Sequence, residues 1–224
     1  MGYKITIDGP SGSGKGYVAG EISKKLNIVN IDTGALYRAY GLYCVDNKVN
    51  LEDKDSIING LEDVQISLKQ QTDKIHIYLN EVDVSDKIRN EKIGYAAAKV
   101  AKIPEVREYI VSIQRSVAGE NNVVTEGRDI GSVVFPEAEL KIYLTATEDV
   151  RATRRLKDLV EKGYDISFDE VLEDIRKRDL SDMTREISPL VKTDDMIEVD
   201  TTNLNKQEVV EKILELVIKK GLVK

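Results

Sequence analysis

The sequence contains few of the residues that would indicate disulfides, histidine chemistry or insertion into a membrane. Its single cysteine, Cys44, cannot form an internal disulfide, and His76 is its single histidine. No apolar run approaches the roughly 20 residues of a membrane-spanning helix, and the segment after Met1 lacks the basic and apolar regions of a signal peptide. We therefore expect a cytoplasmic protein without a membrane partner, with Cys44 in the core and His76 on the surface of a strand.

Positive charge is also in deficit, because the formal net charge is −7. An acidic chain repels nucleic acid and anionic membranes, so we expect neither as a partner. Hydrophobic residues make up 41% of the 224 positions and charged residues 33%, which is typical of a folded globular protein. A small phosphorylated ligand is compatible with this charge, because a few arginines can reverse the field inside one cleft.

The chain alternates short β-branched segments with helical ones. Such alternation predicts an α/β fold with a parallel β-sheet flanked by helices. Asn205 and Glu208 have the spacing of a capping box at the start of the last helix. The expected strands are 3–8, 28–32, 122–126, 141–146 and 196–200, and the expected helices are 18–26, 35–45, 91–101, 104–118, 148–162, 168–178 and 205–220.

Residues 62–84 have a different pattern. Apolar residues alternate with polar ones around Ile66 and again around Ile77, on either side of the polar stretch 70–74. Val82 and Val84 begin a third short segment of the same kind. Period-two alternation with one apolar face predicts a small antiparallel β insertion.

A glycine-rich loop lies between the first expected strand and the first expected helix. Its glycines allow successive backbone N–H groups to point inward, and the helix that follows presents the positive end of its dipole. Lys15 adds a charge suited to the β and γ phosphates of a nucleotide. The alternative is a tight strand-to-helix turn with a surface lysine, but the motif and its placement favour phosphate binding. The loop reads Gly9, Pro10, Ser11, Gly12, Ser13, Gly14, Lys15.

The position after Lys15 departs from the phosphate-loop motif. The motif has Ser or Thr there, whose hydroxyl binds Mg²⁺, whereas this chain has Gly16 followed by Tyr17. Mg²⁺ would then be held by nucleotide oxygens, water and a nearby carboxylate such as Asp8 or Asp32. The identity of the metal ligands is left open.

Several segments together resemble the bacterial-type cytidylate kinase family, over nearly the whole chain. The segments are Ile7-Asp8-Gly9-Pro10-Ser11-Gly12, Asp32-Thr33-Gly34-Ala35-Leu36-Tyr37-Arg38, Glu126-Gly127-Arg128-Asp129-Ile130-Gly131, Val133-Val134-Phe135-Pro136, and Arg178-Asp179 through Arg185. The glycine loop alone would indicate only a superfamily, and the other segments are more specific.

The resemblance implies a monomeric kinase with a P-loop NTPase-like sheet, a small antiparallel β insertion and a helical lid. It implies one kinase domain, 1–224, with a core of 1–34, 119–150 and 186–224. The monophosphate-binding region would be about 35–118, with the β insertion at about 62–84, and the lid would be about 151–185. The implied reaction is Mg²⁺-dependent phosphoryl transfer from ATP to CMP or dCMP, in pyrimidine nucleotide metabolism.

Thr33, Tyr37 and Arg38 follow the second strand, at the edge of a parallel sheet where ligands bind. If a helix begins at Ala35, Tyr37 and Arg38 lie in its first turn, where an arginine can bind a phosphate with two parallel bonds. A capped helix with a surface arginine explains the same residues. The family resemblance implies that they contact the monophosphate.

Arg128 and Asp129 follow another strand, at the same edge. A carboxylate that accepts from the cytosine amine would repel the carbonyl of uracil, so such a site discriminates strongly. An Arg–Asp pair that braces a loop is the alternative. The resemblance implies that Asp129 and Arg107 contact the base and Arg128 the acceptor phosphate. A serine common in the family corresponds here to Ala98, so one base contact is lost.

Arg178, Asp182 and Arg185 have helical spacing, which is equally compatible with an exposed ion pair. The resemblance implies that Arg178 and Asp182 hold the ribose and that Arg185 contacts the transferring phosphate.

In the expected lid, Arg151, Arg154 and Arg155 share a helical face. Three cations so placed repel one another unless an anion lies between them. The resemblance implies that they contact ATP, and a solvated basic patch is the alternative.

The predicted catalytic residues are therefore Lys15, Arg128, Arg178 and Arg185. The acceptor is an ionised phosphate oxygen, so positioning and charge neutralisation suffice without a general base. Two rival functions remain at this point: a kinase of the same fold with UMP, AMP or an alcohol as acceptor, and a nucleotide-binding regulator without turnover.

Overall fold

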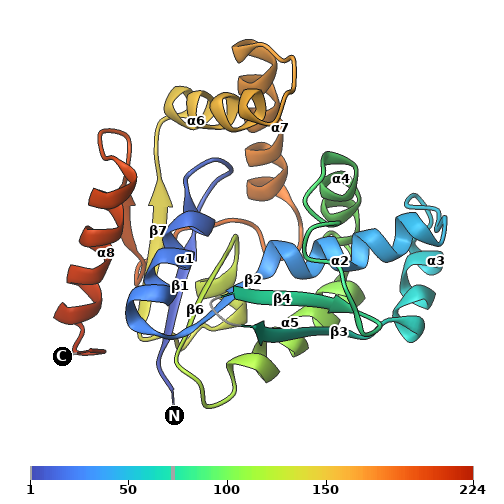
Figure 1. Cartoon of the computed structure of the whole chain (residues 1–224), viewed down its shortest axis with the longest axis horizontal. Helices are drawn as coiled ribbons and strands as arrows, with labels where there is room; N and C mark the ends of the chain where they lie inside the picture. The colour runs from blue at the N-terminus through green and yellow to red at the C-terminus, as the bar shows by residue number, and fades with distance from the viewer. Residues whose placement is uncertain (1, 72–73, 224) are drawn as a thin grey trace. The chain divides into compact units, whose positions relative to one another are not determined.

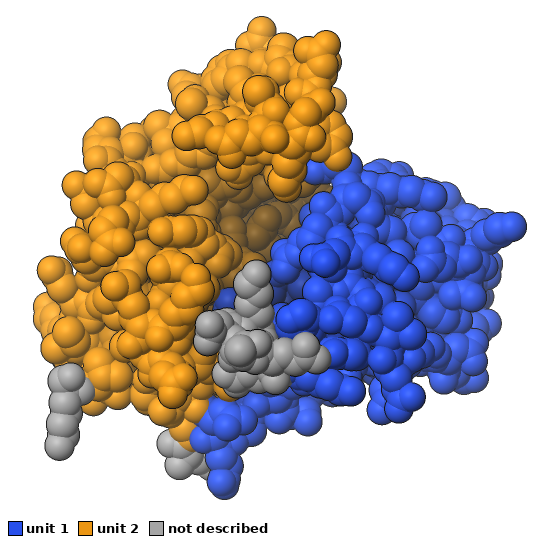
Figure 2. Space-filling view, in the orientation of Figure 1, with its two compact units in different colours: residues 1, 30–121 blue, residues 2–29, 122–224 orange. Residues whose placement is uncertain are grey.

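The structure is a computed structural model that describes residues 2–71 and 74–223. Within it the chain forms two compact units, which we treat separately (Figure 2). Unit 1 comprises Asn30–Asn121 and unit 2 comprises Gly2–Val29 together with the described residues from Asn122 onward.

Unit 2 is built on parallel strands flanked by helices (Figure 1). The strands β1 (Lys4–Asp8), β6 (Val123–Gly127), β7 (Leu140–Thr145) and β8 (Ile197–Asp200) lie in the order β6-β1-β7-β8. All three pairings are parallel, and Ile7 is aligned with Glu126 on one side and with Ile142 on the other. The carboxyl ends of β1 and β6 therefore lie at the same edge, where Asp8 is aligned with Gly127.

Two helices pack together over this sheet. Helix α1 (Lys15–Leu26) and helix α8 (Lys206–Lys219) contribute apolar side chains to one core with the strands. Asn205 and Glu208 form the expected capping box at the start of α8, which confirms that prediction.

Helices α6 (Glu148–Glu161) and α7 (Phe168–Thr184) share a small core of their own. It consists of Ala152, Leu159, Val171 and Ile175, with further half-buried apolar side chains around it. A second capping box, between Ser167 and Glu170, begins α7. Because α7 continues to Thr184, it is longer than the predicted 168–178.

Between β6 and β7 the chain makes a single π-helical turn, η2 (Ile130–Val134). The amide of Phe135 donates to the carbonyl of Ile130, five residues earlier, at 2.7 Å. Sequence periodicity gave no sign of this turn.

Unit 1 is mainly helical and carries the antiparallel insertion. Strand β2 (Val29–Asp32) leads into α2 (Thr33–Asp46), α3 (Lys54–Asn59) and the 3₁₀ turn η1 (Gly60–Asp63). Strands β3 (Ile66–Gln71), β4 (Lys74–Leu79) and β5 (Val82–Asp83) follow, and helices α4 (Glu91–Val100) and α5 (Pro104–Ala118) complete the unit. Helices α2 and α4 approach closely at Gly41, where a Cβ would lie 2.9 Å from the amide nitrogen of Ala97.

Most of the predicted elements are confirmed, including the parallel sheet and the antiparallel insertion, in which β3 pairs with β4 and β4 with β5. Cys44 is fully buried, and His76 lies on β4, half-buried beside Asp83. The predicted polar stretch 70–74 includes Thr72 and Asp73, which lie outside the described residues. Helix α3 was missed, and the start of α2 was predicted two residues too late. Over the described part of the chain, every helix is too short or too polar to cross a membrane.

Candidate active site

The glycine loop of unit 2 joins β1 to α1, as predicted, and its backbone packs tightly against later segments. A Cβ at Gly9 would lie 2.1 Å from the carbonyl oxygen of Leu144, at the end of β7. Gly12 has φ 74°, and a Cβ there would lie 3.1 Å from the Cβ of Arg151. Only glycine combines this backbone conformation with such close contacts.

Lys15 is the first residue of α1, and its ammonium group turns back into the loop. Nζ donates to the carbonyl of Pro10 at 2.7 Å and to Oγ of Ser13 at 3.3 Å. Burial, followed by the nearby Arg128, lowers the pKa of Lys15 to about 7. A lysine so desolvated gains from any anion that binds beside it.

The two carboxylates considered as metal ligands already have other partners. Asp8 accepts from the amides of Ile130 at 2.9 Å and Gly131 at 2.7 Å. Burial raises the pKa of Asp8 to about 6, although these amide donors favour the ionised form. In unit 1, Asp32 caps α2 by accepting from the amide of Ala35 and pairs with Arg89 at 3.1 Å. Both carboxylates therefore have partners within the protein, and the described residues contain no group of three or more His, Cys, Asp or Glu that could hold an ion.

Gly16 and Tyr17 follow Lys15 in the first turn of α1. A Cβ at Gly16 would lie 3.8 Å from a carboxylate oxygen of Glu126. Tyr17 is 43% exposed, and the ammonium group of Lys206 lies 5.0 Å from its ring centroid. The tyrosine therefore stands on the surface, in cation–π contact with α8.

A network of alternating charge joins the segment after β6 to the end of α7. Arg128 donates from Nε to Asp182 at 2.7 Å. Asp129, which is buried, accepts from Nη2 of Arg185 at 3.4 Å. Arg185 also donates to the carbonyl of Ser188 at 2.7 Å. Two crossed pairs, Arg128 with Asp182 and Arg185 with Asp129, therefore bring together four of the predicted site residues.

Arg178 is more exposed than the four residues of this network. Its guanidinium pairs with Asp174 at 2.9 Å and is 42% exposed, whereas Arg185 is 13% exposed. Helix α7 ends at Thr184, and Arg185 is its C-cap residue. Arg178 and Asp182 are therefore helical, whereas Arg185 has an extended backbone.

The predicted residues of unit 1 lie on α2 and α5. Thr33 is the first residue of α2, so Tyr37 and Arg38 lie in its second turn rather than the first. Arg38 donates to the carbonyls of Ile88 at 3.0 Å and Asn90 at 3.1 Å. The buried guanidinium of Arg107 lies 5.9 Å from the ring centroid of Tyr37. Arg107 and Tyr37 are thus neighbours, as residues that serve one ligand would be.

Two of the three arginines of α6 have acceptors within the protein, so the predicted need for an external anion between like charges does not apply to them. Arg151 is buried and donates to Asp179, to the carbonyl of Ser11 at 2.8 Å and to that of Ala146 at 3.0 Å. Arg154 donates to Oγ1 of Thr201 at 2.9 Å and to its carbonyl at 2.7 Å. Internal acceptors satisfy these cations without an external anion, and a direct contact of Arg151, Arg154 or Arg155 with ATP stays a prediction.

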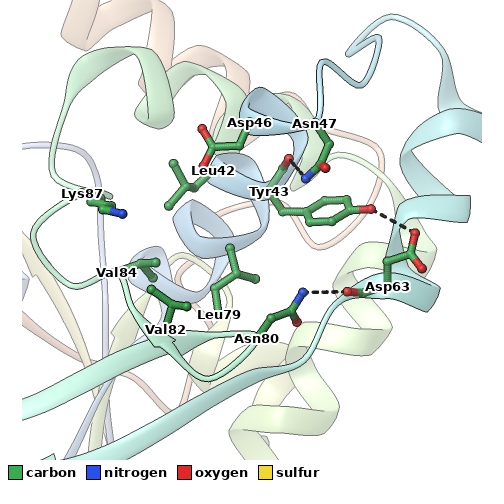
Figure 3. A pocket seen from close by; sticks show the side chains of 10 residues that line it. All are labelled: Leu42, Tyr43, Asp46, Asn47, Asp63, Leu79, Asn80, Val82, Val84 and Lys87. Atoms are coloured by element: carbon green, nitrogen blue, oxygen red, sulfur yellow. Dashed lines mark hydrogen bonds between the residues drawn. The ribbon is translucent and has the colours of Figure 1, made fainter.

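A pocket of about 440 Å³ lies within unit 1, between α2 and the antiparallel strands (Figure 3). Tyr43 and Asp63 meet across it through a 3.2 Å hydrogen bond, and Asn80 donates to the carbonyl of Asp63. Its lining residues include none of the predicted site residues, so we do not assign the substrate to it. They are Leu42, Tyr43, Asp46, Asn47, Asp63, Leu79, Asn80, Val82, Val84 and Lys87.

The sequence pattern assigned no role to Asp179, although this residue contacts the glycine loop directly. It is 7% exposed, accepts from the amide of Ser11 at 3.0 Å and pairs with Arg151. The one available signal was its place beside Arg178 in a segment with a family resemblance.

The family model and the curated relatives both match nearly the whole chain. The family model described as cytidylate kinase matches residues 5–219. A cytidylate kinase of Carboxydothermus hydrogenoformans is 47% identical over 218 residues, covering 97% of this chain and 98% of the relative. A cytidylate kinase of Fusobacterium nucleatum is 47% identical over 206 residues, covering 92% and 93%. An uncharacterized protein of Eubacterium ventriosum, 13% identical, has a similar fold with a TM-score of 0.52 over 98% of this chain and 99% of its own.

Proposed function

The chain belongs to the cytidylate kinase family, and we propose that it transfers the γ-phosphoryl group of ATP to CMP or dCMP. The observation that carries the assignment is the match of the family over nearly the whole chain, together with a glycine loop that encloses Lys15. The products are ADP and CDP or dCDP.

The reaction needs little covalent chemistry from the protein. An ionised phosphate oxygen of the acceptor forms a bond to the γ-phosphorus, and the bond from that phosphorus to the bridging oxygen of ADP breaks. Because the attacking oxygen carries no proton, no general base is required. The protein's task is to align the two phosphates and to neutralise the negative charge spread over the transferred group.

We assign ATP to the glycine loop of unit 2. Pro10 has no amide N–H, and the amide of Ser11 donates to Asp179. The amides of Gly12–Gly14 and the positive end of α1 suit phosphate oxygens, and Lys15 supplies a positive charge beside them. Nζ of Lys15 carries three protons, so it can donate to a phosphate oxygen while it keeps its hydrogen bond to the carbonyl of Pro10. We assign Gly16 and Tyr17 to the rim of this site, and Arg154 and Arg155 to a lid of about 151–185.

We assign the acceptor to the crossed ion pairs of unit 2 and to the arginines of unit 1. Asp129 would accept from the cytosine amine, and Arg107 would donate to the base. Arg178 and Asp182 would hold the ribose, and Arg185 the transferring phosphate. The remaining contacts, to the acceptor phosphate, are assigned to Arg128, Thr33, Tyr37 and Arg38. A guanidinium already paired with a carboxylate exchanges that partner for a phosphate without being desolvated anew, which makes the network a suitable receptor.

Magnesium would enter as Mg-ATP. The described residues contain no three-ligand cluster of His, Cys, Asp or Glu, which suits an ion held mainly by phosphate oxygens and water. When bound, it would neutralise phosphate charge. We further propose a monomer acting in the cytoplasm.

A coupled assay of ADP release tests the proposal directly. CMP, dCMP, UMP and AMP are each supplied with ATP and Mg²⁺, beside a reaction without acceptor. We expect a rate concentrated on CMP and dCMP. A preference for UMP or AMP would retain the kinase and replace the acceptor, and a rate equal to that without acceptor would favour a nucleotide-binding regulator.

A further inference from the structure

Asp179 of α7 holds the glycine loop from outside the group of residues assigned to the reaction. Its Oδ1 accepts from the amide of Ser11 at 3.0 Å, and its Oδ2 accepts from Nη1 of Arg151. Nη1 of Arg151 also donates to the carbonyl of Ser11 at 2.8 Å. The amide and the carbonyl of Ser11 are therefore both engaged, one by the carboxylate and the other by the guanidinium.

Arg151 is itself fixed in place. Its Nε donates to the carbonyl of Ala146 at 3.0 Å, and its Cβ lies 3.1 Å from the place that a Cβ at Gly12 would take. The loop thus rests directly on the first turns of α6, and a buried, charge-assisted contact joins it to α7.

The planarity of the peptide bond carries this contact to the phosphate-binding lysine. In a trans peptide the N–H and the preceding C=O point in opposite directions. Because Asp179 holds the amide of Ser11, the carbonyl of Pro10 is directed to the other side of that peptide plane. That carbonyl accepts from Nζ of Lys15 at 2.7 Å and from Oγ of Ser13 at 3.0 Å.

The next peptide is held in the same manner. Arg151 binds the carbonyl of Ser11, so the amide of Gly12 in the same peptide must point away from Arg151. Two successive peptides of the loop are oriented by one ion pair.

We propose that Asp179 is a positioning residue that, with Arg151, sets the orientation of the Pro10–Ser11 and Ser11–Gly12 peptides and so places Lys15 and the amide of Gly12 for the phosphates of ATP. The proposal rests on the assignment of ATP to this loop. It gives Arg151 an indirect role through the loop backbone in place of a direct contact with nucleotide.

A purely structural role, in which Asp179 only attaches α7 to the rest of unit 2, makes a different prediction. Loss of fastening would lower the fraction of folded protein and would affect both substrates alike. Loss of loop orientation would weaken ATP binding selectively, and the loss would depend on Lys15.

The test is a double-mutant cycle on ATP affinity, measured by calorimetry without acceptor. We expect Asp179→Ala to weaken ATP binding about ten- to a hundredfold, the range of a lost charge-assisted hydrogen bond, and CMP binding less than about threefold. In a Lys15→Ala background, Asp179→Ala should weaken ATP binding by a smaller factor than in the wild-type protein, because the part of the effect that acts through Lys15 is already lost and only the part that acts through the amide of Gly12 remains.

Two controls separate orientation from stability. Glu173→Ala removes an exposed ion pair with Lys177 on the same helix, and Leu159→Ala loosens the small core of α6 and α7. Both should leave ATP affinity within about threefold, as expected for sites without a direct connection to the loop. Asp179→Asn, which keeps the size of the side chain, serves as the folded variant if Asp179→Ala does not fold, and it should weaken ATP binding because its amide group opposes Arg151.

Additive losses in the cycle, equal losses for ATP and CMP, or an equal loss of ATP affinity in Leu159→Ala would each overturn the proposal. The double-mutant cycle and the comparison with Leu159→Ala measure ATP binding alone, so these two outcomes do not depend on which acceptor is used. A wild-type protein that binds ATP but forms no CDP would contradict the proposed function and leave the positioning role standing.

Discussion

The buried carboxylate of Asp129 accepts from the guanidinium of Arg185 at 3.4 Å, in the segment that follows β6. This contact fixes a carboxylate oxygen at the carboxyl edge of a parallel sheet, where ligands of such sheets bind. The same guanidinium lies 4.0 Å from Asp182, which in turn pairs with Arg128. The predicted base-reading and phosphate-binding residues of unit 2 are therefore coupled electrostatically.

Asp129→Asn should reduce the preference for CMP over UMP. The carboxylate accepts from the cytosine amine and repels the uracil carbonyl, whereas an amide can donate to that carbonyl. We expect the ratio of kcat/KM for CMP to that for UMP to fall about tenfold or more, with little change in the KM for ATP. An unchanged ratio would exclude Asp129 as the residue that reads the base.

Lys15→Ala should abolish most of the turnover. Removal of one preorganised donor at a developing charge costs about 10²–10³ in kcat, and the ammonium group of Lys15 lies within the loop, 2.7 Å from the carbonyl oxygen of Pro10. Steady-state rates and thermal unfolding should be measured together. Lys24→Ala, which removes an exposed pair with Glu21 on the same helix, is the matched control and should retain its rate. Wild-type turnover in Lys15→Ala would remove the loop from the mechanism.

The rate at low ATP should fall as the pH rises above about 7. Burial lowers the pKa of Lys15 to about 7 in the nucleotide-free protein, so the charged form that attracts phosphate is present below this pH and is lost above it. The pH dependence of kcat/KM for ATP reflects the pKa values of the free enzyme. This parameter should therefore decline about tenfold per pH unit above pH 7. Bound phosphates raise the pKa of Lys15 again, so kcat should hold to higher pH.

Lys15→Arg provides the comparison for this pH profile. A guanidinium remains charged throughout the accessible range, so the decline above pH 7 should disappear even if the overall rate is low. A wild-type profile of kcat/KM that stays level to pH 9 would contradict the assignment of this limb to Lys15.

The sequence predicted those features that depend on local pattern. Period-two alternation identified β3 and β4, and the glycine loop was found because its motif is contiguous. The capping box at Asn205 was readable from a spacing of three residues. The six-residue α3 was missed because it is shorter than two turns and has no apolar stripe that periodicity could detect.

Local sequence patterns could not predict contacts between residues that are far apart in the sequence. The crossed pairing of Arg128 with Asp182 joins residues 54 positions apart, and the contact of Asp179 with Ser11 spans 168 positions. Nothing in local spacing distinguishes Asp182 from Asp179, which lie on the same helix and have different partners. The turn η2 depends likewise on Asp8, 122 positions from Ile130.

Asp8→Asn should reveal this structural role of Asp8. Each carboxylate oxygen accepts from one backbone amide of η2, and an asparagine would turn an NH₂ group toward one of these donors. We expect a loss of about 1–3 kcal/mol in the free energy of unfolding, the cost of leaving a buried donor unsatisfied. Urea unfolding measures it, with Asp158→Asn on the exposed face of α6 as the control, expected to change stability by less than about 0.5 kcal/mol.

The same variant distinguishes this role from metal binding. If Asp8 holds η2 in place, Asp8→Asn lowers stability equally with and without Mg²⁺, and the Mg²⁺ concentration for half-maximal rate stays the same. A metal ligand would behave in the opposite way, because its loss shifts the Mg²⁺ requirement and leaves the stability of the metal-free protein nearly unchanged. Since both oxygens of Asp8 are occupied by amides at 2.9 and 2.7 Å, we expect the first result.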